Sequence, residues 1–383
     1  MWAAAASLAA WVYLYFFHGG FWRGDQRLGD GPAELGAWPR VTAIVPARDE
    51  EATIGRCLAA LVAQDYAGPL TVILADDSSS DGTAAEAARV AAAAPPGRPV
   101  ETVTAPPLEP GWTGKLWALN AGLDAAATAA PDYLWFTDAD IIHEPEVLTS
   151  LVAKAEEDNR ALVSLMVRLN CETFWERLLI PAFVFFFQKL YPFPRVNDPG
   201  SEVAGAAGGC VLLRRAALAS AGGLAAIRSE IIDDCALARL IKGARHAIWL
   251  GLADHSRSLR RYEGLADIWS MVARTAFTQL NHSYLAVLGA VLGMVLVYLV
   301  PPAAVLGFVF HQNLLADGLG AVAWLLMAAA YLPTIRDFAR PPLEAVALPI
   351  AAFFYGAMTA GSALDHLRGK GGRWKQRSYD FRS

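Results

Sequence analysis

Short apolar runs alternate with alanine-rich stretches between Arg40 and Leu252, and this alternation limits the possible fold more than any other feature. The continuous hydrophobicity of the runs is typical of buried strands, which are expected at Val41–Pro46, Leu70–Ala75, Val100–Thr104, Tyr133–Thr137 and Leu162–Val167. The stretches between them are expected to be helices, at Thr53–Ala63, Thr83–Ala93, Lys115–Ala127 and Glu144–Glu156. Such alternation predicts an α/β domain with a doubly wound, mostly parallel sheet.

Acidic residues stand at the ends of three of these strands, and a further acidic pair follows later in the chain. The clusters are Asp49-Glu50-Glu51, Asp76-Asp77, Asp138-Ala139-Asp140 and Asp233-Asp234. Doubly wound sheets bind ligands beyond the carboxyl ends of their strands. The first three clusters are therefore expected to border one ligand site. Their shared position is a stronger signal than any one of the motifs.

The first two clusters have the chemistry of a nucleoside site. Asp77 can accept hydrogen bonds from a nucleobase imide and a ribose hydroxyl. Helix capping is the alternative, and it accounts for Asp81, but two adjacent acids exceed what a cap needs. Asp49 is either a second nucleoside contact or part of the acidic first turn of a helix. Both interpretations of Asp49 stay open.

The other two clusters have the chemistry of a metal site and of a base. Asp138 and Asp140 can direct alternate carboxylates toward one Mg²⁺ or Mn²⁺ ion that also binds substrate phosphates, although a solvated acid pair is the alternative. Asp233 is expected to cap a helix that ends near Lys242. Asp234 is then left to point into the cleft, where a partly desolvated carboxylate can deprotonate an alcohol.

Lys115 follows Gly114 at the start of a predicted helix. The spacing differs from that of a phosphate-binding P-loop, because Leu116 stands where the hydroxyl residue belongs and the first glycine is misplaced. This excludes a P-loop NTPase. Lys115 can still bind a diphosphate together with the helix N-terminus, and an ordinary surface lysine is the alternative.

The composition indicates that part of the chain lies in lipid. Hydrophobic residues make up 55% and charged residues 18% of the 383 residues, against about a quarter charged in soluble domains. Residues 1–22 are predicted to form an N-terminal transmembrane anchor, since Trp2–Trp22 approaches the ~20 residues that a crossing needs. Arg23 and Arg27 then place the following domain in the cytosol and the protein in the inner (cytoplasmic) membrane. The net charge of −5 argues against a nucleic-acid partner.

A second apolar block covers residues 283–365 and precedes a basic tail, residues 366–383. Its three runs are Tyr284–Phe310, Leu314–Ile335 and Leu343–Leu364. If all three cross, the tail ends outside, against the charge rule. We prefer an interfacial position for Leu343–Leu364, which keeps the tail in the cytosol; a hairpin at Pro301-Pro302 is the alternative.

An aromatic stretch, Glu172–Pro194, predicts a helix near residues 173–191. It fits a core helix, and equally an interfacial helix that brings the cleft to the bilayer, where a lipid acceptor can enter.

The ordered set of motifs resembles the family 2 glycosyltransferases, which are inverting enzymes with the GT-A fold. The resemblance covers Val41–Leu280, within a predicted catalytic domain of residues 38–282. The matching segments are Val45-Pro46-Ala47-Arg48-Asp49-Glu50, Ala75–Thr83, Gly114-Lys115 with Ala118-Leu119-Asn120, and Asp138-Ala139-Asp140. Asp233-Asp234 stands where members carry Glu-Asp. The resemblance implies a nucleotide-sugar donor, such as a UDP-sugar, a divalent cation and Asp234 as the catalytic base.

Within that family, the chain is most similar to membrane glycosyltransferases associated with hopanoid biosynthesis. The similarity rests on Met271–Leu280, Gly208-Gly209-Cys210 and the tail segment Gly371–Lys375. Processive polysaccharide synthases carry a Gln-x-x-Arg-Trp motif, of which only Arg274 is retained here. Arg274 can neutralise the leaving diphosphate, or it is a helix-surface arginine. The predicted activity is a single transfer to a lipid; a polysaccharide synthase and a non-catalytic membrane scaffold are the alternatives.

Overall fold

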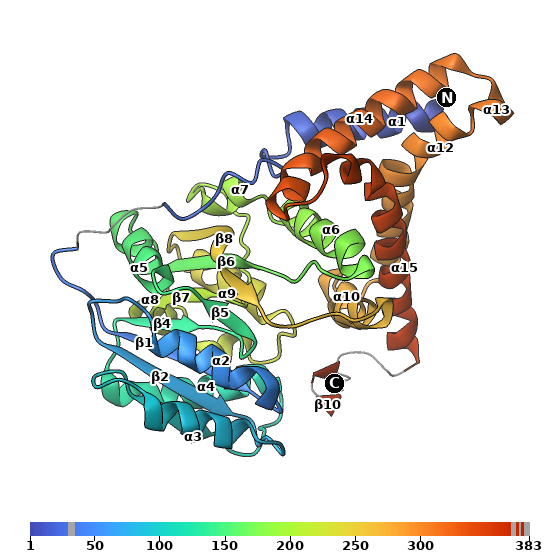
Figure 1. Ribbon diagram of the computed structural model, residues 1–383. Helices are drawn as coiled ribbons and strands as arrows, with labels where there is room; N and C mark the ends of the chain where they lie inside the picture. The colour runs from blue at the N-terminus through green and yellow to red at the C-terminus, as the bar shows by residue number, and fades with distance from the viewer. Residues whose placement is uncertain (30–34, 369–372, 375–376, 379–383) are drawn as a thin grey trace. The chain divides into compact units, whose positions relative to one another are not determined.

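The computed structural model describes residues 1–29, 35–368, 373–374 and 377–378 (Figure 1). Most of the predicted basic tail, 366–383, therefore lies outside the described residues, as does most of the tail segment Gly371–Lys375. The chain divides into two compact units. The first consists of residues 1–25, 171–194 and 261–373, and the second of residues 26–170, 195–260 and 374–383.

The second unit is built around an eight-stranded sheet in the order β3-β2-β1-β4-β7-β6-β8-β5. Strands β3, β2, β1 and β4 are parallel to one another, and β6 is parallel to β8. Strand β7 runs antiparallel to β4 and β6, and β5 runs antiparallel to β8. The strands are β1 (Val41–Ala47), β2 (Leu70–Asp76), β3 (Val100–Thr104), β4 (Tyr133–Phe136), β5 (Ile141–His143), β6 (Leu162–Arg168), β7 (Val211–Arg214) and β8 (Ile248–Ser258). The predicted α/β class with a mostly parallel sheet is confirmed.

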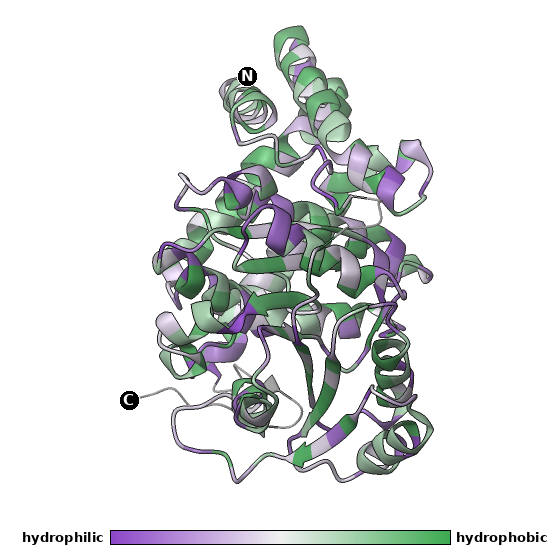
Figure 2. Ribbon diagram, turned by 90° about the vertical axis from the view of Figure 1, so that its left-hand side faces the viewer, coloured by the Kyte–Doolittle hydropathy of each residue, from purple (hydrophilic) through white to green (hydrophobic). Residues whose placement is uncertain are grey.

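Helices connect these strands and cover the sheet (Figure 1). They are α2 (Glu51–Val62), α3 (Thr83–Ala93), α4 (Gly114–Ala126), α5 (Val147–Glu157), α8 (Arg215–Ser220) and α9 (Asp233–Gly243), with the short α7 (Phe193–Asn197) and the 3-10 turn Leu224–Ile227. The four helices expected from the sequence correspond to α2, α3, α4 and α5. Hydrophobic residues dominate the strands between them (Figure 2), and the core is formed where these strands face α2 and α5.

Close packing of α4 on the sheet depends on a glycine. A Cβ atom on Gly122 would lie 2.4 Å from Cγ2 of Ile44 on β1 and 3.3 Å from the Cβ of Ala75 on β2. Because a larger residue would push the helix away, Gly122 sets how closely α4 lies against β1.

The sheet differs from the expectation at its edges. β3 was expected to be buried, but it is an edge strand whose residues are mostly exposed, as its sequence Val-Glu-Thr-Val-Thr allows. Strands β5, β7 and β8 were not expected. β5 and β7 are too short to give a periodic signal, and the second half of β8 is polar.

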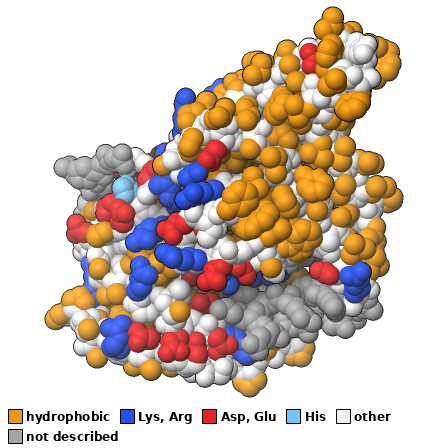
Figure 3. Space-filling model, turned by 45° about the vertical axis from the view of Figure 1, so that its right-hand side comes forward, with side chains coloured by type: hydrophobic (Ala, Val, Ile, Leu, Met, Phe, Trp, Pro, Cys, Tyr) orange, Lys and Arg blue, Asp and Glu red, His pale blue; other side chains and the backbone are white. Residues whose placement is uncertain are grey.

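The first unit is helical. Its helices are α1 (Trp2–Phe16), α6 (Phe174–Leu190), α10 (Leu265–Gln279), α11 (Tyr284–Met294), α12 (Val300–Leu306), α13 (Phe308–His311), α14 (Leu314–Asp337) and α15 (Leu348–Leu367). A π-helical turn joins α11 to α12, and a 3-10 turn precedes α15. Three continuous helical stretches are long and apolar enough to cross a membrane: Tyr284–Leu306, Leu314–Asp337 and Pro342–Leu367. Exposed hydrophobic side chains cover these helices (Figure 3), which supports membrane association.

The N-terminal helix is shorter than expected. It ends at Phe16 after 15 residues, so it is about 22 Å long against a hydrocarbon core of ~30 Å. The backbone then turns at Gly19 and Gly20, both with positive φ. The apolar character of Trp2–Trp22 thus continues beyond the helix, and α1 does not reach the length of the predicted anchor.

The predicted aromatic helix is present as α6. Thr173 forms a capping box with Glu176, in which each side chain accepts a hydrogen bond from the other residue's backbone N–H. Pro181 lies inside the helix, and one face is buried against α14 and α15. The interfacial position of this helix stays a prediction, as does that of Leu343–Leu364.

Candidate active site

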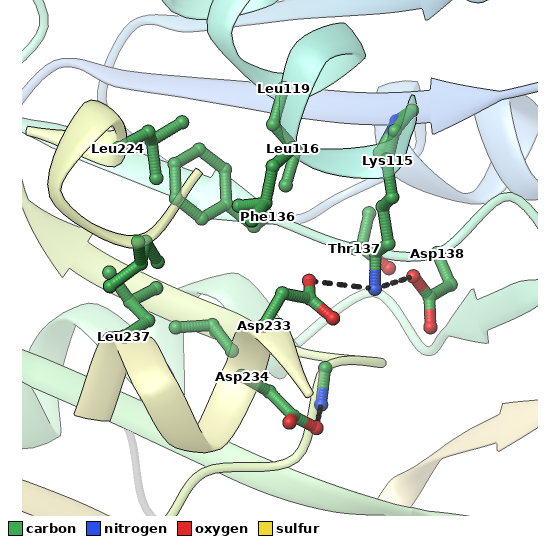
Figure 4. Close-up of a pocket in the computed structure, with 14 residues that line it drawn as sticks. Lys115, Leu116, Leu119, Phe136, Thr137, Asp138, Leu224, Asp233, Asp234 and Leu237 are labelled. Carbon is green, nitrogen blue, oxygen red and sulfur yellow. Dashed lines mark hydrogen bonds and ion pairs between the residues drawn. The ribbon is translucent and has the colours of Figure 1, made fainter. Parts of the chain in front are cut away.

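A pocket opens in the second unit at the carboxyl edge of β4, where α4 and α9 begin (Figure 4). Its polar side carries Lys115, Thr137, Asp138, Asp233 and Asp234. Its other lining residues are Pro46, Leu116, Leu119, Phe136, Gly208, Val211, Leu224, Ile227 and Leu237. A group of charges therefore faces a wall of apolar side chains.

Lys115 is the cation at the centre of this pocket. Its Nζ lies 2.9 Å from Oδ1 of Asp138 and 3.2 Å from Oδ2 of Asp233 (Figure 4). Burial works against the charge of Lys115, but the carboxylates outweigh it and raise the pKa of the ammonium. Lys115 is therefore charged, and it joins the end of β4 to the start of α9.

Asp234 is held by two backbone groups. Its Oδ2 accepts a hydrogen bond from the Gly208 N–H at 2.8 Å, and its Oδ1 accepts one from the Cys235 N–H at 2.7 Å. Burial and the neighbouring Asp233 raise the pKa of Asp234 to about 6, against the opposing effects of Lys115 and the two N–H groups. A carboxylate of this kind is ionised at neutral pH and can still accept a proton.

Asp233 does not have the predicted role of helix cap. The N-cap of α9 is Ile232, and Asp233 is the first helical residue. Its carboxylate instead pairs with Lys115. The partner of Asp233 lies on α4, far away in the sequence, so the sequence alone could not show this ion pair.

Asp138 and Asp140 lie directly after β4. The Asp138 carboxylate is about one-third exposed and pairs with Lys115. Burial and Asp138 raise the pKa of Asp140 to about 6, whereas Arg260 lowers it. Among the described residues, no third His, Cys, Asp or Glu ligand joins this pair within 4.8 Å. Two hard oxygen ligands fit Mg²⁺ or Mn²⁺ when substrate phosphates supply the remaining ligands.

Asp77 is buried at the end of β2, with a side chain that is 1% exposed. Its N–H donates to the Ala47 carbonyl at 2.8 Å. Nη1 of Arg48 donates to the Asp77 carbonyl at 2.6 Å and lies 3.4 Å from Oδ2 of the same residue. These contacts fix the loop after β2 to the loop after β1.

Asp49 connects the same two loops. Its Oδ1 accepts hydrogen bonds from the N–H and the hydroxyl of Ser80, at 2.8 and 3.1 Å, and its own N–H donates to Oγ of Ser79. The backbone of Asp49 has φ 52°, a conformation that Asp tolerates better than most residues. Asp49 therefore organises the loop, and its contact with a nucleoside stays a prediction. Asp81 accepts from the Thr83 N–H at the start of α3, as the capping interpretation expected.

The strand register places the predicted residues along one edge. Ala47 pairs with Asp76 and Ile44 with Phe136 in parallel ladders, so Asp49, Asp77 and Asp138 follow neighbouring strand ends. The loop with Gly208 precedes β7, which pairs with β4, and brings Asp234 to the same edge. Arg274 lies on α10 in the first unit, and its contact with a diphosphate stays a prediction. Gly208 was noted for its sequence similarity alone, because a backbone donor leaves no signal in a sequence.

Comparisons with known proteins agree with this architecture. A family model described as glycosyl transferase family 2 matches residues 42–222. An N-acetylglucosaminyltransferase of Bradyrhizobium elkanii is 32% identical over 144 residues, which are 36% of this chain and 71% of that protein. The chain belongs to glycosyl transferase family 2. An N-acetylglucosaminyltransferase of Mesorhizobium japonicum is 30% identical to this family 2 glycosyltransferase over 145 residues, but the chain spans only 32% of its length.

One solved structure resembles this family 2 glycosyltransferase along almost the whole chain. It is the mannosyltransferase PcManGT from Pyrobaculum calidifontis, in complex with GDP-Man and Mn²⁺. The TM-score is 0.54 at 20% identity, with 96% of this chain and 99% of the other covered. The two proteins share a fold. The sequence comparisons thus confirm the predicted family, and this structure confirms the predicted GT-A fold, whereas none of these comparisons defines the acceptor.

Proposed function

We propose that this family 2 glycosyltransferase is a membrane-bound inverting enzyme that transfers a sugar from a nucleotide-sugar to a lipid hydroxyl. One observation carries the proposal. Asp234, with a pKa of about 6, lies in the same pocket as Lys115 and Asp138. A base and a diphosphate-binding cation thus border one space, which is what a direct displacement at an anomeric carbon needs.

The donor would lie along the carboxyl edge of the sheet. Asp77 and Asp49 hold the nucleoside, and Lys115 and Arg274 bind the diphosphate. A UDP-sugar is the first candidate, as the family resemblance of the motifs implies, and a GDP-sugar is the second, since the mannosyltransferase structure contains GDP-Man.

A divalent cation would be held by Asp138 and Asp140. Lys115 already places a positive charge against Asp138, and the pKa of Asp140 is raised to about 6. Both features support a cation site here, because the Asp138 carboxylate acts on Lys115 and on Asp140. When bound, Mg²⁺ or Mn²⁺ supplies charge that stabilises the departing nucleoside diphosphate.

Asp234 would act on the acceptor. The hydroxyl oxygen forms a bond to the anomeric carbon on the face opposite the diphosphate, while its proton passes to the Asp234 carboxylate. The bond between the anomeric carbon and the diphosphate oxygen breaks, and the diphosphate leaves with the electron pair. Attack from the opposite face inverts the anomeric configuration. Phe136, Leu224 and Leu237 exclude water beside Asp234 and strengthen these electrostatic interactions.

A lipid acceptor is supported by the three long apolar helices of the first unit and by the apolar wall of the pocket. Within lipids, the similarity of Met271–Leu280 and Gly208-Gly209-Cys210 to hopanoid-associated enzymes favours a hopanoid or another isoprenoid-derived alcohol. The catalytic unit would face the cytosol, where nucleotide-sugars are made, from the cytoplasmic membrane.

The test uses the full-length protein in detergent with Mn²⁺ and a total membrane lipid extract. It is offered UDP-N-acetylglucosamine, UDP-glucose and GDP-mannose separately, and lipid masses are recorded over time. We expect one lipid to gain the mass of one sugar residue with one donor. Products that lengthen with time would instead establish a polysaccharide synthase. Failure to release nucleotide from any donor would favour the non-catalytic scaffold.

A further inference from the structure

A chain of buried hydrogen bonds lies next to the proposed site, and one of its members, Thr137, also lines the pocket. Oγ of Ser256 lies 2.8 Å from Nδ1 of His143, and Nε2 of His143 lies 2.9 Å from Oγ1 of Thr137. Thr137 Oγ1 in turn lies 2.9 Å from the carbonyl oxygen of Gly209. Each of the three side chains belongs to a residue that is at most 2% exposed. We call this chain the Ser256–Gly209 relay.

The direction of every hydrogen bond in the relay follows from its last member. A carbonyl oxygen can only accept, so the single hydroxyl proton of Thr137 goes to Gly209. Thr137 must then accept from the N–H at Nε2 of His143. Nδ1 is left without a proton and accepts from the hydroxyl of Ser256. Burial lowers the pKa of His143 to about 3, and the neutral ring in this one tautomer satisfies all three side chains.

The relay ends at the two parts of the proposed site. Thr137 is followed directly by Asp138 and, two residues later, by Asp140. Gly209 follows Gly208, whose N–H donates a hydrogen bond to Oδ2 of Asp234. One run of buried polar groups therefore connects the backbone that carries the proposed metal ligands with the backbone that holds the proposed base.

Packing fixes the position of the Gly209 end. A Cβ atom on Gly209 would lie 2.9 Å from Cγ2 of Val167 on β6. The backbone therefore approaches β6 more closely than a larger residue would allow. At the other end, Ser256 belongs to the ladder of β8 with β5, in which it pairs with His143. The relay thus spans two rigid supports.

We propose that the Ser256–Gly209 relay is a positioning device that sets the backbone after β4 relative to Asp234, with His143 and Thr137 as its positioning residues. The inference rests on the proposed function. Burying three polar side chains is costly compared with apolar residues of similar size, and here Thr137 joins the two segments that carry site residues, while Ser256 fixes the ring of His143 from β8. Neither His143 nor Thr137 needs to contact the substrate for this role.

The decisive variant is Thr137→Val, which keeps the shape of the side chain and removes both hydrogen bonds. We expect kcat for nucleotide-sugar turnover to fall about 10- to 100-fold, since a misplacement of about 1 Å can cost that much. Thr137→Ser keeps the hydroxyl and should retain kcat within about threefold of the wild type. Thr42→Val is the matched control, because Thr42 is equally buried, on β1. Turnover by Thr137→Val at the wild-type rate would overturn the proposal, and so would an equal loss in Thr137→Ser.

A second variant covers the case in which Thr137→Val does not fold. Ser256→Ala removes only the far end of the relay, so Nδ1 of His143 loses its donor and the ring is no longer held from the Ser256 side. The hydrogen bond from the Gly208 N–H to the Asp234 carboxylate should then weaken, so the pKa of Asp234 should rise. The acid limb of the pH–rate profile should move to higher pH while KM for the donor stays unchanged. A loss of folded protein without any shift of the limb would show that the relay only stabilises the fold.

A metal titration separates failure of this inference from failure of the proposed function. Mn²⁺ alone is titrated into wild-type protein and into Thr137→Val, and free Mn²⁺ is followed by electron paramagnetic resonance. The relay predicts a severalfold weaker affinity in the variant, and equal affinity would contradict it. A wild-type protein that binds Mn²⁺ but releases no nucleotide from any donor would contradict the proposed function alone.

Discussion

Asp234 combines two backbone hydrogen bonds with a raised pKa. The pKa of about 6 predicts that turnover rises as the pH passes upward through 6 and levels off above 7, because the carboxylate accepts a proton only when ionised. At pH 5, on the order of a tenth of the molecules would hold the ionised form. The measurement is kcat/KM between pH 5 and 8. Asp234→Asn should lose transfer while still binding the donor, and a flat profile in the wild type would contradict the assignment.

Lys115 supports Asp234 through its charge. Removing the charge in Lys115→Met should raise the pKa of Asp234, because Lys115 lowers it, and the acid limb should move to higher pH. Loss of a charged contact to the diphosphate should also reduce kcat about 10²-fold. Lys115→Arg retains the charge and serves as the matched control. The measurement is the pH–rate profile of the wild type and the two variants. An acid limb at the wild-type pH in Lys115→Met would contradict the prediction that Lys115 lowers the pKa of Asp234.

Replacing Asp140, one of the two proposed metal ligands, tests the metal site. Asp140→Ala should abolish the part of donor binding that depends on Mn²⁺, because one of the two protein ligands is lost. Calorimetry with and without Mn²⁺ measures this part. Asp132→Ala is a suitable control, since Asp132 is an exposed carboxylate at the opposite end of β4. Donor binding by Asp140→Ala that still responds to Mn²⁺ as in the wild type would remove Asp140 from the ligand set.

At the scale of elements, α4 depends on its glycine. Gly122→Ala gains about 1 kcal/mol of helix propensity but places a methyl group 2.4 Å from Ile44. Overpacking costs about 1–3 kcal/mol, so we expect net destabilisation of about 1 kcal/mol. Gly243→Ala is the control, because a Cβ there meets no atom within 4 Å. Thermal unfolding in detergent compares the two variants, and an unchanged transition in Gly122→Ala would show that α4 can move.

The strands that could be predicted from the sequence are those whose two faces are both buried. β1, β2, β4 and β6 are continuous apolar runs covered on both faces, so their hydrophobicity alone located them. The predicted burial of β3 was wrong because an edge strand can be polar, and β5 was missed because three residues are too few to give a periodic signal. The N-terminal helix was predicted too long because hydrophobicity continues past Gly19 and Gly20, where the backbone turns.

At the scale of the whole molecule, the number of membrane crossings decides on which side of the membrane the C-terminus lies. If Leu343–Leu364 lies in the interface, the C-terminus stays in the cytosol with Arg336 and Arg340. A green fluorescent protein fused after Ser383 should then be fluorescent, and an alkaline phosphatase fused there should be inactive. A dark green fluorescent protein fusion together with an active alkaline phosphatase fusion would show that all three stretches cross the membrane: Tyr284–Leu306, Leu314–Asp337 and Pro342–Leu367.

The candidate site was only partly visible in the sequence. Acidic residues at strand ends could be recognised because the carboxyl ends of parallel strands meet at one edge, and the structure does bring Asp138, Asp234 and Lys115 to one pocket. The prediction that Asp233 caps α9 was wrong, and the relay through His143 was not predicted. Both depend on partners that are distant in the sequence.

Local hydrophobic patterning determined the fold class, most strand positions and the apolar character of the C-terminal helices, because burial and lipid contact act on each segment directly. Only the tertiary structure decided which groups hold Asp234, how Lys115 is shared between two carboxylates, and which tautomer His143 adopts. Those features arise from hydrogen bonds and ion pairs between residues of different segments, such as the bond from Thr137 to Gly209. Such residues come within bonding distance only once the sheet has formed.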